Sequence, residues 1–248
     1  MKQFALYDLS ERPATFDIVT FLAIAKTIGL TNVRFVYGSW KPKNYTMAQA
    51  EERFRSICVP AVDLYGMTWD IGAREGMQVT HFVNGMIGLY NKHHVIKKIA
   101  YPVEPKDYIT ITKRNSRNPT RNTKDDEWDE FAKTVNRKVV VLPDYEDQPI
   151  SLMDRMKLYA GAEMNLFVSN GPLTLCVFSE APYLCMRTIG KEEDPNNSPR
   201  WMKKVLGIEP GFQYPWANSR QRLSYLDDTA ENIHKEFNSM CEKQRMVA

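Results

Sequence analysis

The sequence lacks several features that would place it at once in a broad class of protein. No stretch is apolar for long enough to form a membrane-spanning helix, which takes about 20 residues. There is no internal repeat and no low-complexity tract. The four cysteines, Cys58, Cys176, Cys185 and Cys241, have no close spacing of the kind found in zinc sites or disulfide frameworks. Three of them have apolar neighbours, which is typical of reduced, buried thiols.

Three common catalytic or nucleotide-binding motifs are also missing. The sequence has no G-x-S-x-G, no P-loop and no G-x-G-x-x-G, which weakens hydrolase, kinase and dehydrogenase hypotheses. Cys176 lies between Leu175 and Val177 with no histidine nearby, so a cysteine nucleophile is not favoured there.

Charge and composition are unremarkable overall. A net charge of +3 does not call for nucleic acid as a partner, and 43% hydrophobic with 25% charged residues is ordinary for a soluble globular protein. The segment MKQFALYDLS lacks the apolar region and cleavage site of a signal peptide, so a cytoplasmic location is expected. Residues 113–124 are the exception, because they are strongly basic.

Strand and helix patterns alternate along the chain. Strands are expected at residues 4–7, 33–37, 59–65, 108–112, 138–142, 166–168 and 183–186, and helices at residues 15–28, 47–57, 77–89, 125–134, 151–160, 173–179 and 229–244. This alternation predicts parallel sheets with right-handed crossovers. The expected fold class is therefore α/β, with two small Rossmann-like halves facing a cleft.

Two prolines mark the expected boundary between the halves. Pro102 and Pro105 give residues 101–106 an extended, semi-rigid character. The predicted domains are residues 1–102, on the acceptor side, and residues 103–248, on the donor side. The last helix is expected to pack back on the first domain.

Residues 166–186, LFVSNGPLTLCVFSEAPYLCM, read as strand, turn, helix and second strand without interruption. Asn170, Gly171 and Pro172 end the strand, and a helix starting at Leu173 is expected to leave free N–H groups at the carboxyl edge of the sheet. Such an edge favours phosphate or carboxylate. A simple strand–helix–strand corner is the alternative interpretation.

A basic loop follows the strand at residues 108–112. Arg114, Arg117 and Arg121 lie after the carboxyl end of that strand, which is the edge expected for the Asn-Gly-Pro turn. Arginine forks and a helix start at one edge would suit a diphosphate. A solvated charged loop is the alternative.

An acidic turn, PDYED, follows the strand at residues 138–142. Asp144 and Glu146 would then contact sugar or ribose hydroxyls at the same edge. The alternative is an exposed acidic turn that contacts no ligand. No histidine or second acidic cluster nearby completes an oxygen-rich metal site, so no metal is expected.

Five segments resemble a bacterial glycosyltransferase-like family of the GT-B fold, associated with surface-polysaccharide synthesis. They are PATFDIVTFLAIA, RFRSICVPAVDLYG, YITITKRNSRNPTRNTKDDEW, VVVLPDYED and DRMKLYAGAEMNLFVSNGPLTLC, and they cover most of residues 1–190. The resemblance implies a donor site with backbone at Asn170, Gly171, Pro172 and Leu173. The phosphate ligands would be Arg114 and Arg121, followed by Asn122. Arg117 is an addition to the family pattern, and Asp144 or Glu146 would bind a hydroxyl.

The leading hypothesis is a metal-independent glycosyltransferase without a cofactor, which moves a hexosyl or related sugar from a nucleotide sugar to a glycan or lipid-linked acceptor. Asp8 and Asp17 flank the loop after the first strand and are candidates for the catalytic base, although either could cap the following helix. A noncatalytic nucleotide-sugar or anion-binding module, suggested by the short chain, and a sugar-nucleotide epimerase are the alternatives. Peripheral contact with a membrane is left open.

Overall fold

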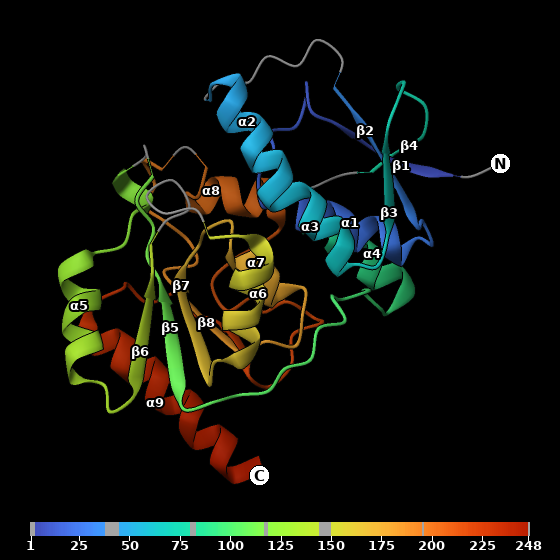
Figure 1. Cartoon of the computed structure of the whole chain (residues 1–248). Helices are drawn as coiled ribbons and strands as arrows, with labels where there is room; N and C mark the ends of the chain where they lie inside the picture. The colour runs from blue at the N-terminus through green and yellow to red at the C-terminus, as the bar shows by residue number, and fades with distance from the viewer. Residues whose placement is uncertain are drawn as a thin grey trace. The chain divides into compact units, whose positions relative to one another are not determined.

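The structure is a computed structural model that describes residues 3–37, 45–79, 83–116, 119–143, 150–194 and 196–247 (Figure 1). The chain divides into two compact units. Unit 1 comprises Met1–Tyr101 and Ser151–Asp154, and unit 2 comprises Pro102–Ile150 and Arg155–Ala248. Each unit is described by itself below.

Unit 1 is built on a parallel sheet with the strand order β3-β2-β1-β4. The strands described in it are β1 (Phe4–Asp8), β2 (Asn32–Val36), β3 (Thr68–Ile71) and β4 (Met77–Gln78). Its helices are α1 (Asp17–Thr27), α2 (Met47–Arg53), the π-helix η1 (Phe54–Cys58), α3 (Val59–Leu64) and α4 (Val83–His93).

Aromatic side chains hold the helices of unit 1 on one face of its sheet. The Tyr7 ring on β1 meets Phe21 of α1 edge to face, with ring centroids 5.0 Å apart. Phe35, the register partner of Tyr7 on β2, meets Phe54 in the same way at 4.8 Å. Such pairs add about 0.5–1.5 kcal/mol each beyond the area that they bury.

The expected strand at residues 59–65 is wrong, because α2, η1 and α3 form one continuous helical segment. Pro60 lies in the first turn of α3, directly after the π-helical turn, where a missing N–H is tolerated. The strands β3 and β4 were not expected: β3 is an edge strand with mostly exposed residues, and β4 is two residues long. Residues 77–89 were expected to be one helix, whereas α4 begins only at Val83.

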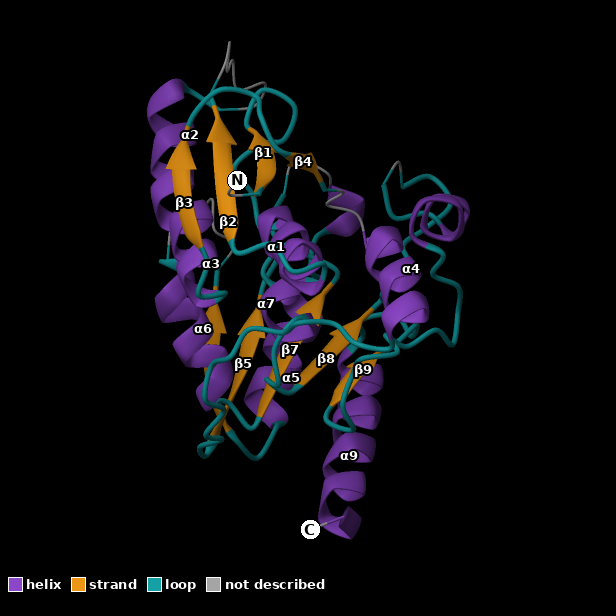
Figure 2. Ribbon diagram, turned by 90° about the vertical axis from the view of Figure 1, so that its right-hand side faces the viewer, coloured by secondary structure: helices purple, strands orange, loops and turns teal. Residues whose placement is uncertain are grey.

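Unit 2 is built on a second parallel sheet, with the order β6-β5-β7-β8-β9. Figure 2 shows β5, β7, β8 and β9 in that order. Its strands are β5 (Tyr108–Thr112), β6 (Lys138–Leu142), β7 (Met164–Val168), β8 (Tyr183–Met186) and β9 (Gln221–Leu223). Its α-helices are α5 (Asp125–Thr134), α6 (Leu152–Gly161), α7 (Leu173–Val177), α8 (Pro199–Trp201) and α9 (Ala230–Val247). The first residues of α6, up to Asp154, are grouped with unit 1. Two short turns, η2 (Pro119–Arg121) and η3 (Met202–Leu206), complete it.

Helices cover both faces of the second sheet. Ile109 and Ile111 of β5 lie in a buried cluster with Trp128 of α5 and Phe237 of α9. On the other face, Tyr159 of α6 packs edge to face on Phe167 of β7, with centroids 5.2 Å apart. Two parallel sheets with crossover helices confirm the α/β fold class with two Rossmann-like halves. The expected return of the last helix to the first half stays a prediction.

The thiols give a simple test of this packing. Cys58, Cys176 and Cys185 are buried, as expected from their apolar neighbours, and burial raises the pKa of each thiol, to about 12 for Cys185. Cys241 is only partly buried. A thiol reagent should therefore modify Cys241 first in the native protein and the other three only after unfolding. Mass spectrometry of the labelled peptides checks this order, and early labelling of Cys176 would contradict the packing of α7.

Within the described residues, no helix combines the length and apolar character needed to cross a membrane.

Candidate functional site

The chain changes direction across the second sheet between β5 and β7. From β5 it crosses to β6 on one side, and it then returns past β5 to β7 and continues outward through β8 and β9. This is the doubly wound order 2-1-3-4-5, in which ligands bind beyond the carboxyl ends of the two strands at the reversal. The loops after Thr112 and Val168 are therefore the candidate ligand site of unit 2.

Arg114 joins these two loops. It lies two residues beyond the end of β5, and its Nη1 donates a 2.7 Å hydrogen bond to the backbone oxygen of Ser169, the first residue after β7. Its Nε lies 3.4 Å from the Ser116 hydroxyl. The basic loop and the Asn-Gly-Pro turn, which the sequence places at one edge, are thus in direct contact in the structure.

The loop that carries Arg114 is held by its own side chains. The Asn122 amide oxygen accepts from the Ser116 backbone N–H at 2.7 Å, and the Asn122 amide nitrogen donates to the Ser116 oxygen at 3.1 Å. The Thr123 backbone N–H donates to the Arg114 oxygen at 3.1 Å. Asn122 therefore has a clear part in shaping the loop, while its expected contact with a donor stays a prediction.

Arg121 faces a buried carboxylate. Its Nε is 4.0 Å from Oδ2 of Asp194, in the segment after β8, and the Arg121 side chain is 20% exposed. An arginine that is paired in this way has part of its charge neutralised within the unit. Its role as a phosphate ligand stays a prediction, as do the roles of Gly171 and Pro172.

Three of the candidate residues, Arg117, Asp144 and Glu146, lie outside the described residues. Among the side chains that the structure does describe, no group of three or more His, Cys, Asp or Glu residues is placed to hold a metal ion. Metal independence stays a prediction.

The first backbone N–H groups of α7 are already hydrogen-bonded to residues of the preceding turn. The Leu173 N–H donates to the Asn170 side-chain oxygen at 3.1 Å, the Thr174 N–H to the Gly171 oxygen at 3.0 Å, and the Leu175 N–H to the Pro172 oxygen at 3.1 Å. The expectation of free N–H groups facing outward is therefore wrong for these three donors. Asn170 acts as a local cap. An anion at this edge would have to be bound mainly by side chains.

A buried ion pair that the sequence did not reveal holds the far side of the basic loop. Arg187, which follows β8, donates to the backbone oxygens of Thr120 and Asn122, and its Nε lies 3.3 Å from Oδ1 of Asp228. Asp228 also accepts from the Trp128 indole N–H at 2.9 Å. Burial raises the pKa of Asp228, against the Trp128 hydrogen bond and the Arg187 charge.

The two candidate bases, Asp8 and Asp17, belong to unit 1. Asp8 ends β1, is 3% exposed, and accepts from the Ser10 backbone N–H at 2.9 Å and the Ser10 hydroxyl at 2.5 Å. Its other carboxylate oxygen lies 3.4 Å from Arg74. Asp17 is the exposed first residue of α1, and its N–H lies 3.4 Å from the Thr15 hydroxyl. Their catalytic roles stay predictions.

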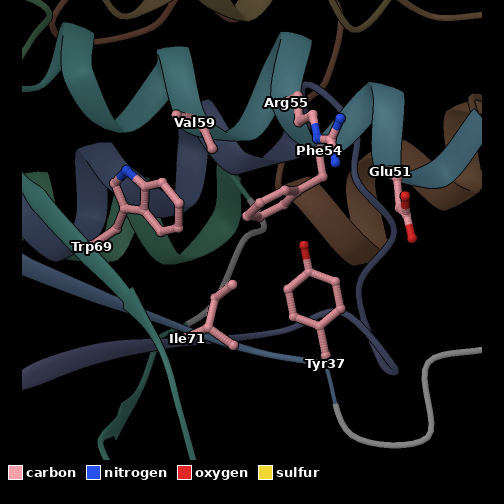
Figure 3. A pocket seen from close by; sticks show the side chains of 7 residues that line it. All are labelled: Tyr37, Glu51, Phe54, Arg55, Val59, Trp69 and Ile71. Atoms are coloured by element: carbon pink, nitrogen blue, oxygen red, sulfur yellow. The ribbon is translucent and has the colours of Figure 1, made fainter.

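Unit 1 contains a cavity of about 440 Å³ beside the ends of β2 and β3. Figure 3 shows Trp69, Ile71 and Tyr37 on the sheet side and Phe54 and Val59 on the helix side. The Trp69 and Phe54 rings meet edge to face with centroids 5.9 Å apart. Trp69 is 39% and Ile71 56% exposed, so both present apolar surface to a ligand. The sequence expectation did not include this cavity, because it did not include β3.

No protein-family model and no curated protein matches the chain. Among solved structures, the chain is similar to E. coli heptosyltransferase WaaC with ADP, with a TM-score of 0.39 and 12% sequence identity over 96% of this chain and 73% of that chain. A TM-score this low supports no inference about activity, ligands or site residues.

Proposed function

We propose that the chain is a glycosyltransferase that transfers a sugar from a nucleotide sugar to a glycan or lipid-linked acceptor without a metal ion. The observation that carries the proposal is the 2.7 Å contact between Arg114 and the Ser169 oxygen at the strand reversal of unit 2. It brings a guanidinium to the edge where doubly wound sheets bind ligands. The reaction class is proposed from the resemblance of five sequence segments to a glycosyltransferase-like family. A cytoplasmic location stays a prediction.

In this proposal unit 2 holds the nucleotide diphosphate and unit 1 supplies the acceptor. An acceptor hydroxyl oxygen forms a bond to the anomeric carbon while the bond from that carbon to the diphosphate oxygen breaks. The hydroxyl proton passes to a carboxylate, for which Asp8 and Asp17 are the candidates. Negative charge grows on the leaving diphosphate, and the charge of Arg114 stabilises it more strongly in the transition state than in the bound donor.

The proposal is tested by incubating the protein with a panel of nucleotide sugars and analysing the products. We expect one donor to release its nucleoside diphosphate, by transfer to an added glycan or slowly to water. The Arg114→Ala variant should release it at least about tenfold more slowly, since one charged contact to the leaving group is lost. Release at equal rates from wild type and variant would contradict the role of Arg114.

We assign the acceptor to the aromatic cavity of unit 1. A sugar ring has C–H faces that pack on aromatic rings and hydroxyls around its rim. Trp69, Tyr37 and Phe54 offer the aromatic wall, and Glu51 and Arg55 of the helical segment offer polar groups beside it.

Trp69→Ala tests that assignment. The substitution should raise the KM for an acceptor about fivefold to tenfold, because it removes one aromatic wall, and should leave the KM for the donor unchanged. Ile28→Ala is a matched control, since Ile28 is also 39% exposed in unit 1 and does not line the cavity. Steady-state kinetics with each substrate varied in turn measures both values. An unchanged acceptor KM in Trp69→Ala would place the acceptor elsewhere.

One observation favours the second candidate function, a noncatalytic nucleotide-sugar or anion-binding module. The Asp8 carboxylate, the buried candidate base, is already engaged by Ser10 and Arg74. The module would be supported if the protein binds a nucleotide sugar but neither transfers nor hydrolyses it, with a glycan or a lipid-linked acceptor present.

A further inference from the structure

Arg155 is a buried cation that has no carboxylate partner among the residues that the structure describes. It lies in the first half of α6 and is 0% exposed. Its Nη1 is 3.3 Å from the Tyr159 hydroxyl, but its Nε and Nη2 have no hydrogen-bond partner among the described residues. No carboxylate in the described part of the chain lies within 4.0 Å of it.

The unpartnered atoms form the edge of the guanidinium that binds two oxygens at once. Elsewhere in this chain the same two nitrogens hold carboxylates. Arg34 uses Nε and Nη2 to bind Asp70 at 2.9 and 2.8 Å, and Arg137 uses them to bind Glu163 at 2.7 and 3.3 Å. In Arg155 this fork is the part that has no partner, whereas Nη1 is occupied. The geometry suits a carboxylate or phosphate with two oxygens in one plane.

Arg155 lies near the strand reversal that carries Arg114. The Tyr159 hydroxyl is 2.8 Å from the hydroxyl of Thr112, the last residue of β5, so Arg155 is two hydrogen bonds away from the end of that strand. Because α6 leads into the parallel strand β7, its N-terminal end is at the carboxyl edge of the sheet. Arg155 precedes Tyr159 by one helical turn, which places it further toward that edge.

A fully buried guanidinium without a counter-charge is strongly unfavourable, because it loses its hydration and gains little in return. Arginine keeps its proton under all ordinary conditions, so the cost cannot be relieved by deprotonation. A ligand that supplies two anionic oxygens would relieve it. Among the described residues, Arg155 is thus a charged group without a counter-charge near the edge where the proposed donor site lies.

We propose that the Nε and Nη2 fork of Arg155 binds a phosphate group of the donor diphosphate beside Arg114. This inference rests on the proposed function for the identity of the ligand, but its physical basis is the unbalanced charge. Arg155 would contact the substrate directly and would hold the diphosphate from the α6 side, whereas Arg114 would hold it from the loop after β5.

Arg155→Met is the decisive variant, since methionine fills a similar volume without charge. We expect its melting temperature without ligand to be equal to or above that of the wild type, because an uncompensated charge is removed. We expect its affinity for inorganic pyrophosphate, and for the best of ADP, GDP, UDP and CDP, to fall by at least about 30-fold. Calorimetric titration and thermal unfolding measure both quantities. Arg155→Lys, which keeps the charge but loses the fork, should show an intermediate affinity.

Arg53→Met is the matched control. Arg53 is also buried, at 7% exposure, but its Nε donates to the Ala14 oxygen at 3.0 Å and its guanidinium lies over the Tyr45 ring. Its replacement should lower the melting temperature and leave pyrophosphate binding unchanged. The contrast separates a buried arginine that stabilises the fold from one that binds a ligand.

Two results would overturn the inference. One is a lower melting temperature of Arg155→Met with wild-type pyrophosphate and nucleotide affinity, and the other is a wild-type protein that binds neither pyrophosphate nor any of the four nucleotides. If Arg155→Met does not fold, equal affinity of Arg155→Lys and wild type overturns it. The proposed function can fail separately. If pyrophosphate binding depends on Arg155 but no nucleotide sugar is turned over, the anion site is supported and the transferase activity is contradicted.

Discussion

Asp228→Ala is expected to lower the free energy of unfolding by about 3–5 kcal/mol, the usual cost of removing one member of a buried ion pair. Asp228 is 0% exposed and receives the Trp128 indole N–H at 2.9 Å and the Lys124 backbone N–H at 3.2 Å. The variant leaves both donors without this acceptor and leaves Arg187 without its counter-ion. Burial raises the pKa of Asp228, because the charged carboxylate loses hydration there. Removing the side chain costs more than this desolvation, because it leaves buried hydrogen-bond donors without an acceptor.

Asp227→Ala is the control for that result. Asp227 is the neighbouring residue and pairs with Lys124, but its side chain is 51% exposed, so its loss should cost less than about 1 kcal/mol. Urea unfolding followed by tryptophan fluorescence compares the two variants. Equal losses for both would show that Asp228 does not anchor the basic loop to the rest of unit 2.

Arg114→Ala is expected to lower the affinity for a nucleoside diphosphate by about 10- to 100-fold, the range for a lost hydrogen bond to a charged group. The variant removes the positive charge at the strand reversal and the contact with the Ser169 oxygen. Its affinity should also depend less steeply on salt than that of the wild type, because one charge–charge contact is gone. Calorimetric titration at two salt concentrations measures both effects.

Arg137→Ala is the matched control for Arg114→Ala. Arg137 directly precedes β6, at the amino edge of the same sheet, and binds Glu163 at 2.7 Å. Its loss removes one arginine from unit 2 without touching the carboxyl edge, so the nucleotide affinity should stay at the wild-type value. A similar loss of affinity in both variants would mean that net charge, and no particular site, governs binding.

Sequence patterns were sufficient for the elements with strong local signals. The strands at residues 108–112, 138–142 and 183–186 and the helix at residues 125–134 were predicted with the bounds that the structure shows. Three of the described edge strands, β3, β4 and β9, were missed, because their residues lack the continuous apolar run of a buried strand. The prediction of a strand at residues 59–65 failed because Val59 and Val62 are typical of strands but lie here in α3. Pro60 is tolerated in the first turn of that helix, directly after the π-helical turn.

The candidate site was predictable only in part. Arg114 and the turn at Asn170 were expected at one edge because parallel strands end together. The pairing of β5 with β7 and the contact between Arg114 and the Ser169 oxygen became visible only in the structure. The Leu173 backbone N–H was wrongly predicted to be free, because its hydrogen bond to the Asn170 side chain depends on local side-chain geometry. Asp228 and Arg187 are 41 residues apart in the sequence, and no local sequence pattern predicts such an ion pair.

Arg155 did leave a signal in the sequence. Leu152, Met156 and Tyr159 are spaced as the buried face of a helix, and Arg155 falls on that same face. A charged residue on the apolar face of an amphipathic helix is a candidate for a buried functional group. Its unpartnered fork, however, is visible only once the neighbouring elements are in place.

The most direct test is a crystal structure of the chain with whichever of ADP, GDP, UDP and CDP raises its melting temperature most. We expect the diphosphate to lie beyond the ends of β5 and β7, with its oxygens within hydrogen-bond distance of Arg114 and of Nε or Nη2 of Arg155. A nucleotide bound in the aromatic cavity of unit 1, or at any site away from the loops after Thr112 and Val168, would contradict it.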